Sequence, residues 1–176
     1  IEASHRGLIT TGLNVIISNF NQGIYAVENS QIFANGIRVK NCLGPGIYAY
    51  NSSFVKAENS ISQFNKDGYN VAFGSTMDVD GSEAYENERY GFGVFTGSTL
   101  HSYNTISNSN GHSGYHGWSG VTMHGANAIA NNNGVFGFYG NELSYLFAYQ
   151  SSASGNGTNY SPAANSIGNN NSRITK

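Results

Sequence analysis

Apolar and polar residues alternate in short segments along most of the chain, and Asn, Gly and Ser separate the segments. The phrases GIYAV, GIYAY and GFGVF show this alternation. A period of two places successive side chains on opposite faces, which is typical of β-strands. The stretches between the phrases are rich in turn-forming residues and leave no room for a helix. The pattern therefore predicts an all-β chain of many short strands.

The strand phrases recur at a nearly constant interval. Six similar phrases each open on a glycine, and these glycines follow one another at intervals of 23, 22, 23, 23 and 23 residues. They are Gly23, Gly46, Gly68, Gly91, Gly114 and Gly137. Three short strands in each interval are the signature of a parallel β-helix, in which every coil adds one strand to each of three sheets. We expect a single domain over residues 1–176, with about seven coils of 23 residues.

Three further apolar columns keep the same register. Nine residues after each glycine we expect an inward stack of Ile32, Val55, Met77, Leu100, Met123 and Leu146. Two residues further along lie the small residues Ala34, Ala57, Val79, Ser102, Gly125 and Ala148. A looser column that we also expect to face inward contains Val15, Ile37, Ile61, Ala84, Ile106 and Ile129.

Asparagines recur in register as well. They stand at Asn19, Asn41, Asn65, Asn87, Asn110, Asn133 and Asn156. Stacked amide side chains can hydrogen-bond from one coil to the next, as they do in other stacked-strand structures. We therefore expect an asparagine ladder at one turn of the coil.

Charge and cysteine content remove several classes of function. The formal net charge is −2 and the chain holds eight scattered Lys and Arg residues, so we expect neither nucleic-acid nor anionic-membrane binding. Cys42 is the single cysteine, and no Cys or His spacing matches a structural zinc site. No apolar run is long enough to span a membrane. We expect no metal, no cofactor and no membrane insertion.

The ends of the chain fall inside coils. Because natural solenoids cap their open ends, we expect a piece of a longer protein or ends that partners cover. The last coil is longer by about five residues, and we expect a longer loop over residues 158–170.

The phrase GIYAYNSSFVKAEN and the closing segment NYSPAANSIGNNNSRI resemble the β-helix repeats of bacteriophage tail fibres and tailspikes. The resemblance covers nearly the whole chain. It implies a right-handed, single-stranded parallel β-helix of the pectate-lyase-like type. It also implies a homotrimer in the virion that binds host-surface polysaccharide.

A second resemblance is to β-helical mannuronan epimerases and polysaccharide lyases, through phrases such as AYENERYGFGVFTGSTLHSYNTISNSNG. The Asp-Pro-His-Asp motif of those epimerases is absent, because no proline of this chain is followed by histidine. The resemblance implies a secreted polysaccharide lyase, hydrolase or epimerase as the alternative function. A purely structural shaft is the third possibility.

Aromatic side chains occupy the outward positions of the first strand in several coils. Two and four residues after the glycine lie Tyr25, Tyr48, Tyr50, Phe95, His116, Trp118 and Tyr139. Large aromatic side chains on an exposed surface are usually covered by a ligand or a partner. Tyr and Trp can stack on sugar rings because they have a flat apolar face and a polar edge. A subunit interface and cross-strand packing are the alternatives. The candidate ligand-binding residues are Tyr48, Tyr50, Phe95, His116, Trp118 and Tyr139, and we expect a sugar on Trp118 to hydrogen-bond to His116 and Asn141.

Polar side chains occupy the outward positions of the second strand. One column holds Lys56, Asp78, His101 and His124, and the next holds Glu58, Asp80 and Tyr103. Coil stacking brings such residues within about 5 to 10 Å of one another, which suits acid–base chemistry. The candidate catalytic residues are Glu58, Asp78, Asp80, His101 and His124. A solvated polar face is the alternative, and a cation held by Asp78, Asp80 and His101 is another.

Overall fold

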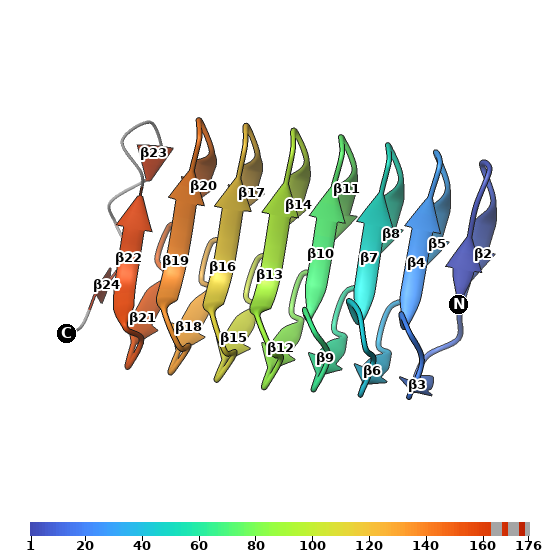
Figure 1. Cartoon of the computed structure of the whole chain (residues 1–176), viewed down its shortest axis with the longest axis horizontal. Helices are drawn as coiled ribbons and strands as arrows, with labels where there is room; N and C mark the ends of the chain where they lie inside the picture. Colours follow the sequence, from blue (N-terminus) through green and yellow to red (C-terminus); the bar gives the residue numbers. More distant parts are fainter. Residues whose placement is uncertain (163–166, 169–172, 175–176) are drawn as a thin grey trace.

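The computed structural model of the chain is a three-sided rod of short parallel strands (Figure 1). It describes residues 1–162, 167–168 and 173–174, and every element formed by these residues is a strand. Each coil contributes one strand to each of three eight-stranded sheets, and the coils stack along the long axis of the rod. The predicted all-β parallel β-helix of about seven coils is therefore confirmed.

The first sheet holds the strand that follows or includes the periodic glycine. Its strands β13, β16 and β19 have six residues each, whereas β4, β7 and β10 have four. In spatial order the sheet consists of β1 (Glu2–Ala3), β4 (Ile24–Val27), β7 (Ile47–Tyr50), β10 (Tyr69–Ala72), β13 (Tyr90–Phe95), β16 (Ser113–Trp118), β19 (Phe136–Asn141) and β22 (Thr158–Pro162).

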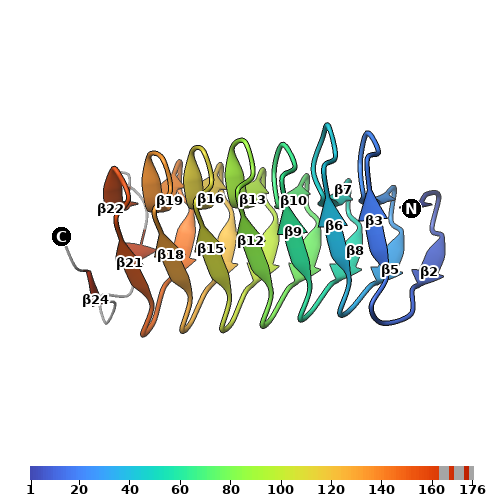
Figure 2. The ribbon, with the colours of Figure 1, turned by 90° about the horizontal axis from the view of Figure 1, so that it is seen from below.

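The other two sheets complete the coil, and Figure 2 shows the third of them along the rod. The second sheet consists of β2 (Leu8–Thr10), β5 (Gln31–Phe33), β8 (Phe54–Lys56), β11 (Thr76–Asp78), β14 (Thr99–His101), β17 (Thr122–His124), β20 (Tyr145–Phe147) and β23 (Ile167–Gly168). The third sheet consists of β3 (Ile16–Ser18), β6 (Arg38–Lys40), β9 (Ile61–Gln63), β12 (Glu83–Tyr85), β15 (Ile106–Asn108), β18 (Ile129–Asn131), β21 (Ser152–Ser154) and β24 (Arg173–Ile174).

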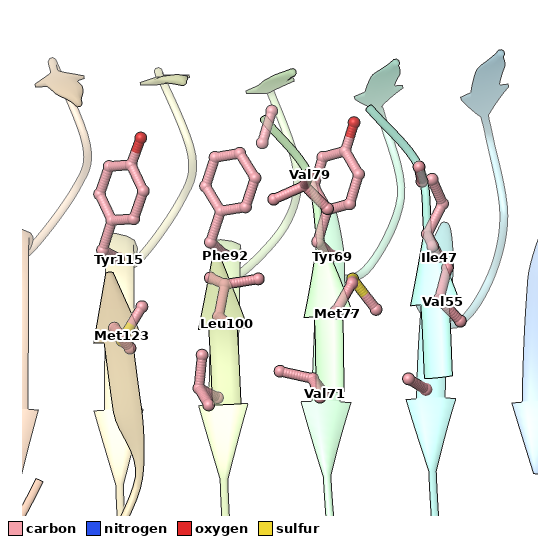
Figure 3. Close-up of a cluster of buried hydrophobic side chains, with 14 of the residues drawn as sticks. Ile47, Val55, Tyr69, Val71, Met77, Val79, Phe92, Leu100, Tyr115 and Met123 are labelled. Atoms are coloured by element: carbon pink, nitrogen blue, oxygen red, sulfur yellow. The ribbon is translucent and has the colours of Figure 1, made fainter. Parts of the chain in front are cut away.

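The predicted inward stack of the second sheet is confirmed. Strand pairing aligns Met77 with Leu100 and Leu100 with Met123, so equivalent side chains lie one above another along the axis. All six members of the column, from Ile32 to Leu146, are at most 2% exposed. Figure 3 shows this stack beside the interior side chains of the first sheet.

Aromatic rings form the interior stack of the first sheet. Tyr69, Phe92, Tyr115 and Phe138 are buried on consecutive coils. Their ring centroids are 4.8, 4.9 and 4.7 Å apart and successive planes differ by 9°. The spacing matches the distance between strands, so the pairing of the backbone fixes the stacking of the rings.

The third inward stack differs from the prediction. Pairing of β9 with β12 aligns Ser62 with Ala84, both fully buried, and leaves Ile61 in the neighbouring outward row. Ile106 and Ile129 continue that outward row and are half-buried, so the predicted column was wrong at these three isoleucines. The inward row consists of Ile17, Val39, Ser62, Ala84, Ser107, Ala130 and Ala153.

From Ser62 onward small side chains occupy this row, and the glycine corner comes close to them. Ser107 Oγ donates to the Gly114 carbonyl oxygen at 2.9 Å and accepts from Asn110 Nδ2 at 3.1 Å. A Cβ atom on Gly114 would lie 2.7 Å from the Gly137 carbonyl oxygen, which is too close for any other residue. The glycine period, the asparagine column and the inward serines are therefore parts of one packing arrangement.

The asparagine ladder is present from the third coil onward. Asn110 Oδ1 accepts from the Asn87 backbone N–H at 3.1 Å and from Asn87 Nδ2 at 2.9 Å. Equivalent backbone bonds link the members Asn65, Asn87, Asn110, Asn133 and Asn156. The side chains of the central members are buried, so each coil is joined to the next by satisfied polar groups inside the rod.

In the second coil Cys42 takes the ladder place instead of the predicted Asn41, and the predicted Asn19 also lies outside the ladder. The Cys42 N–H donates to Asn65 Oδ1 at 2.8 Å, so the cysteine takes the ladder place in its coil. Asn41 precedes Cys42 and has a φ of 57°, and Asn19 has a φ of 65°. Asparagine tolerates this left-handed conformation, which explains why it occurs there without belonging to the ladder.

The expected loop over residues 158–170 contains strands where the structure describes it. Thr158–Pro162 forms β22, which continues the first sheet beside β19, and Ile167–Gly168 forms β23. Residues 163–166 and 169–170 lie outside the described residues.

Candidate functional site

Seven side chains from three neighbouring coils gather on the outer face of the first sheet. We call this group the aromatic platform, and it consists of Tyr90, Phe95, His112, His116, Trp118, Phe136 and Tyr139. Six of them come from β13, β16 and β19, the longest strands of the sheet, which lie side by side in Figure 1. They line a shallow hollow of about 490 Å³.

His116 lies at the centre of the platform and stacks on several of its neighbours. Its ring centroid is 4.3 Å from that of Tyr90 and 4.7 Å from that of Tyr139. The indole of Trp118 is nearly parallel to the imidazole, with a 10° angle between the planes at 6.3 Å. Phe136 stacks on Tyr139 at 4.6 Å and extends the group toward the next coil. The platform is thus a set of interlocked ring faces.

Gly93 makes the platform possible. It precedes His116 by one coil in the same outward row, since Gly93 pairs with His116. A Cβ atom on Gly93 would lie 2.8 Å from the Phe95 ring and 3.4 Å from the Tyr90 ring. The missing side chain therefore lets the two rings close over the strand at 5.8 Å from each other.

Trp118 is the exposed member of the platform, and His116 is covered. The indole residue is 41% exposed, whereas His116 is 5% exposed. The expected hydrogen bond from a bound sugar to His116 is therefore unsupported, because the neighbouring rings shield the imidazole. Asn141 pairs with Trp118 in the next coil and remains beside the indole.

The sequence pattern missed Tyr90, His112 and Phe136. Tyr90 and Phe136 stand one residue before the periodic glycine, outside the phrase that defines the repeat. Strict two-residue alternation groups both with the inward Phe92 and Phe138, two residues further along, so the pattern gave no signal that they face outward. His112 lies in the preceding turn, and its Nδ1 is 2.7 Å from Ser113 Oγ.

An ion pair with a buried carboxylate flanks the platform. Arg89 donates to Asp67 from one edge of its guanidinium, Nε to Oδ1 at 3.0 Å and Nη2 to Oδ2 at 2.6 Å, and its side chain remains 43% exposed. The Asp67 side chain is fully buried and also accepts from Asn70 Nδ2 at 3.2 Å. The guanidinium carbon lies 5.1 Å from the centre of the Tyr90 ring. The cation that contacts the platform is therefore already neutralised by its own carboxylate.

Burial controls the protonation of the two platform histidines. Desolvation is the main cause that lowers the pKa of His116 to about 4, and repulsion from His112 and Arg89 contributes to the same shift. Desolvation and Arg89 also lower the pKa of His112. Desolvation raises the pKa of Tyr90. At neutral pH the platform presents uncharged rings.

We expect the free energy of unfolding to fall as the pH drops from about 6.5 to about 4. The folded pKa of His116 lies below its ordinary value of 6.5, so the unfolded chain binds more protons in this window. Above pH 6.5 the imidazole is neutral in both the folded and the unfolded chain, so its burial does not lower the free energy of unfolding. Between pH 6.5 and 4 the free energy of unfolding falls by about 3 kcal/mol. Denaturant unfolding of the protein and of His116→Phe at several pH values measures the difference.

The Phe variant keeps a ring in the same place but cannot be protonated, so its stability should change less across the window. His5→Asn is the matched control, because the His5 side chain is 84% exposed. Equal pH slopes for the protein and His116→Phe would show that burial of His116 does not act on stability.

The candidate residues Tyr48 and Tyr50 lie in a separate group on the same sheet. We call it the tyrosine cluster, and it consists of Tyr25, Tyr48, Tyr50 and Phe73. Tyr25 stacks on Tyr48 at 5.3 Å, and Tyr50 meets Tyr48 at 5.5 Å and Phe73 at 5.0 Å with tilted rings. The structure thus divides the predicted ligand-binding residues into two aromatic groups.

The polar column of the second sheet contains a close carboxylate–imidazole pair. Asp78 Oδ1 lies 2.6 Å from His101 Nδ1, and the His124 ring lies 5.2 Å from the His101 ring in the next coil. Desolvation and the neighbouring His101 lower the pKa of His124. A carboxylate that holds one imidazole nitrogen orients the other as a base, which is an arrangement that proton transfer can use.

The remaining members of the polar columns have other partners. Glu58 Oε1 forms an ion pair with Lys56 at 3.0 Å, and Asp80 Oδ1 accepts from the Tyr103 N–H at 2.9 Å. Within the described part of the chain no three acidic, histidine or cysteine side chains are grouped to hold a metal ion. The cation hypothesis for Asp78, Asp80 and His101 therefore has no geometric support.

Comparison with known proteins assigns the fold to a family. The family model described as "Right handed beta helix region" matches residues 5–110, which is more than half of the chain. The search of curated protein sequences finds no match to this chain. The search for membrane-spanning helices, made over the described residues, finds no candidate.

Among solved structures the chain is similar to the periplasmic alginate epimerase AlgG. One crystal structure of that enzyme matches with a TM-score of 0.79 and 16% identity over 99% of this chain and 46% of that chain. A double mutant and a single mutant match with TM-scores of 0.82 and 0.81, each at 16% identity over 99% of this chain and 49% of theirs. The chain thus spans about half the length of these enzymes, and at this identity the likeness concerns the fold alone. The chain belongs to the right-handed β-helix family.

Proposed function

We propose that this β-helix binds a host-surface polysaccharide on the aromatic platform. The observation that carries the proposal is the exposed Trp118 indole beside a hollow lined by ring faces. Sugar rings present flat C–H surfaces that pack on such faces, while the indole N–H and the Asn141 amide offer polar contacts. Rigid strands hold the platform, so binding would require little ordering of the protein.

The biological setting of the proposal is a segment of a phage tail fibre or tailspike in the virion, assembled as a homotrimer. Its support is the resemblance of the repeat phrases to those proteins. A secreted protein outside a virion would use the same platform. If the protein is a purely structural shaft that binds no ligand, the aromatic platform would pack against a neighbouring subunit.

Trp118→Ala is expected to weaken polysaccharide binding about fivefold or more. Loss of one aromatic contact of about 1 kcal/mol corresponds to that factor. Titration calorimetry with the bacterial surface polysaccharide that binds most strongly on a glycan array measures the change.

Tyr145→Ala is the matched control, because Tyr145 is 43% exposed but belongs to the second sheet. Light scattering on both variants reports the oligomeric state. If Trp118→Ala dissociates a trimer while the intact protein binds no array polysaccharide, Trp118 belongs to a subunit interface and the proposal fails.

A second candidate function is polysaccharide modification at the Asp78–His101 pair. Two observations favour it: the 2.6 Å contact between the two side chains and the structural likeness to an alginate epimerase. In this role Asp78 would orient His101, which would transfer a proton to or from the sugar.

The enzyme hypothesis predicts that Asp78→Asn and His101→Ala abolish epimerisation or cleavage and change stability by about 1 kcal/mol or less, since both side chains are partly exposed. Proton NMR of mannuronan and of other polysaccharides after incubation reports both reactions. A wild-type protein that leaves every tested polysaccharide unchanged would remove the basis of this hypothesis.

A further inference from the structure

We propose, on the basis of the proposed function, that the ligand is an uncharged oligosaccharide lying along the rod axis across both the aromatic platform and the tyrosine cluster. Four features of the outer face of the first sheet support this inference: the continuity of its two aromatic groups, its lack of charge from β4 to β19, the exposed ring of Phe73 and its repeat distance.

The two aromatic groups form one continuous face. Pairing places Ala72 between Tyr50 and Phe95 in a single outward row. Ala72 is only 3% exposed, so its neighbours cover the small side chain. The neighbouring row leads from Tyr48 through a buried Asn70 to Gly93. Neither row contains a large side chain that would separate the groups.

No Asp, Glu, Lys or Arg stands in the outward rows from β4 to β19, and Glu2 of β1, which pairs with Tyr25, marks the charged end of the face. The outward residues of β4, β7, β10, β13, β16 and β19 are Tyr25, Val27, Tyr48, Tyr50, Asn70, Ala72, Tyr90, Gly93, Phe95, Ser113, His116, Trp118, Phe136, Tyr139 and Asn141. Arg89 contacts this face, but its charge is matched by the buried Asp67. An acidic sugar would lose hydration here without gaining a free cation in return. A neutral hexose or N-acetylhexosamine chain carries no such penalty.

Phe73 places an exposed aromatic ring at the turn that follows β10. Its φ is 54°, and it is 49% exposed. The equivalent positions in the adjacent coils are Asn51 and Thr96, which share the left-handed conformation. The left-handed conformation thus belongs to this turn of the coil, and the exposed ring is what distinguishes Phe73 from its equivalents. Phe73 extends the tyrosine cluster at the edge of Tyr50.

The repeat of the face suits a polymer. Coils are spaced by about 4.8 Å, which is close to the length of one pyranose unit in an extended chain. From β4 to β19 the face covers six coils. A ligand aligned with the axis would therefore place about one sugar on each coil and cover both groups completely when it has about six units.

The charge of the ligand is tested with a panel of neutral and acidic bacterial polysaccharides, probed with the protein and with Trp118→Ala. We expect the Trp118-dependent signals to come from neutral members and to persist at high salt. Oxidising the primary hydroxyls of the strongest neutral binder to carboxylates should weaken its binding at least tenfold. Trp118-dependent binding that favours acidic members and weakens with salt would overturn this inference and leave the proposed function intact.

The extent of the ligand is tested with oligosaccharides of two to eight units cut from the strongest binder. Trp118 is the single tryptophan, so its emission reports occupancy of the platform alone. We expect affinity to rise with length up to about six units. Phe73→Asn should weaken the six-unit oligosaccharide about threefold or more and leave the two-unit oligosaccharide unchanged.

Phe73→Asn introduces the residue that the preceding coil has at the equivalent position, Asn51, so the variant is expected to fold. Thermal unfolding checks this. Equal affinities of the two-unit and six-unit oligosaccharides, or no effect of Phe73→Asn on the longer one, would contradict the extended ligand. A panel without any Trp118-dependent binder would overturn the proposed function together with this inference.

Discussion

Leu100→Asp is expected to unfold the protein or to drive it into aggregates. Leu100 is 1% exposed and lies between Met77 and Met123 in the inward stack of the second sheet. An unpaired carboxylate buried there costs several kcal/mol, which is a large share of the roughly 5–15 kcal/mol that stabilises a typical domain. Circular dichroism and size-exclusion chromatography would show the loss of the folded monomer or oligomer.

Thr99→Asp is the matched control. Thr99 precedes Leu100 in the same strand but faces outward and is partly exposed. The same charge at this position should change the free energy of unfolding by about 1 kcal/mol or less. A folded, soluble Leu100→Asp protein with the stability of Thr99→Asp would contradict the inward register.

Asn110→Ala is expected to lower the free energy of unfolding by about 3 kcal/mol or more. The side chain is buried, accepts from the Asn87 N–H, and donates from Nδ2 to the Ala84 carbonyl oxygen at 3.2 Å. Removing the side chain takes away the hydrogen-bond partner that Asn110 gives to each of these two backbone groups, and each buried unpaired group costs about 1–3 kcal/mol. Equilibrium denaturation in urea measures the change.

Asn21→Ala is the control for this prediction, because Asn21 is exposed and stands outside the ladder. It should change stability by about 0.5 kcal/mol or less. Similar losses in the two variants would mean that the ladder does not stabilise the stacking of the coils.

The fold could be predicted because one interval governs several columns at once. The glycine period fixed the register of Leu100 and its column, and strand alternation then decided which side chains face inward. The predicted third column was wrong at Ile61 and Ile106, because their hydrophobicity suggested that these side chains face inward, whereas they lie in the outward row. From the third coil onward the row beside the glycine corner instead holds small side chains such as Ser62, whose hydroxyl donates to the Gly68 carbonyl oxygen at 2.7 Å.

The candidate site could be predicted only in part. Strand alternation placed Trp118 beside His116, two residues away in the same strand. Coil stacking placed Asp78 beside His101, because it converts a 23-residue interval into contact. Burial of His116 did not follow from the columns, since it depends on Tyr90 and on the space above Gly93. Likewise, no sequence interval shows that Arg89 is neutralised by a buried carboxylate.

The most direct test of the account follows the Trp118 indole while a polysaccharide is added. Because the chain contains one tryptophan, a proton–nitrogen correlation spectrum has a single indole N–H signal. We expect this signal to move in a saturable way with the strongest-binding array polysaccharide, at the dissociation constant that calorimetry gives. An indole signal that stays in place while calorimetry reports binding would contradict the assignment of the aromatic platform as the carbohydrate site.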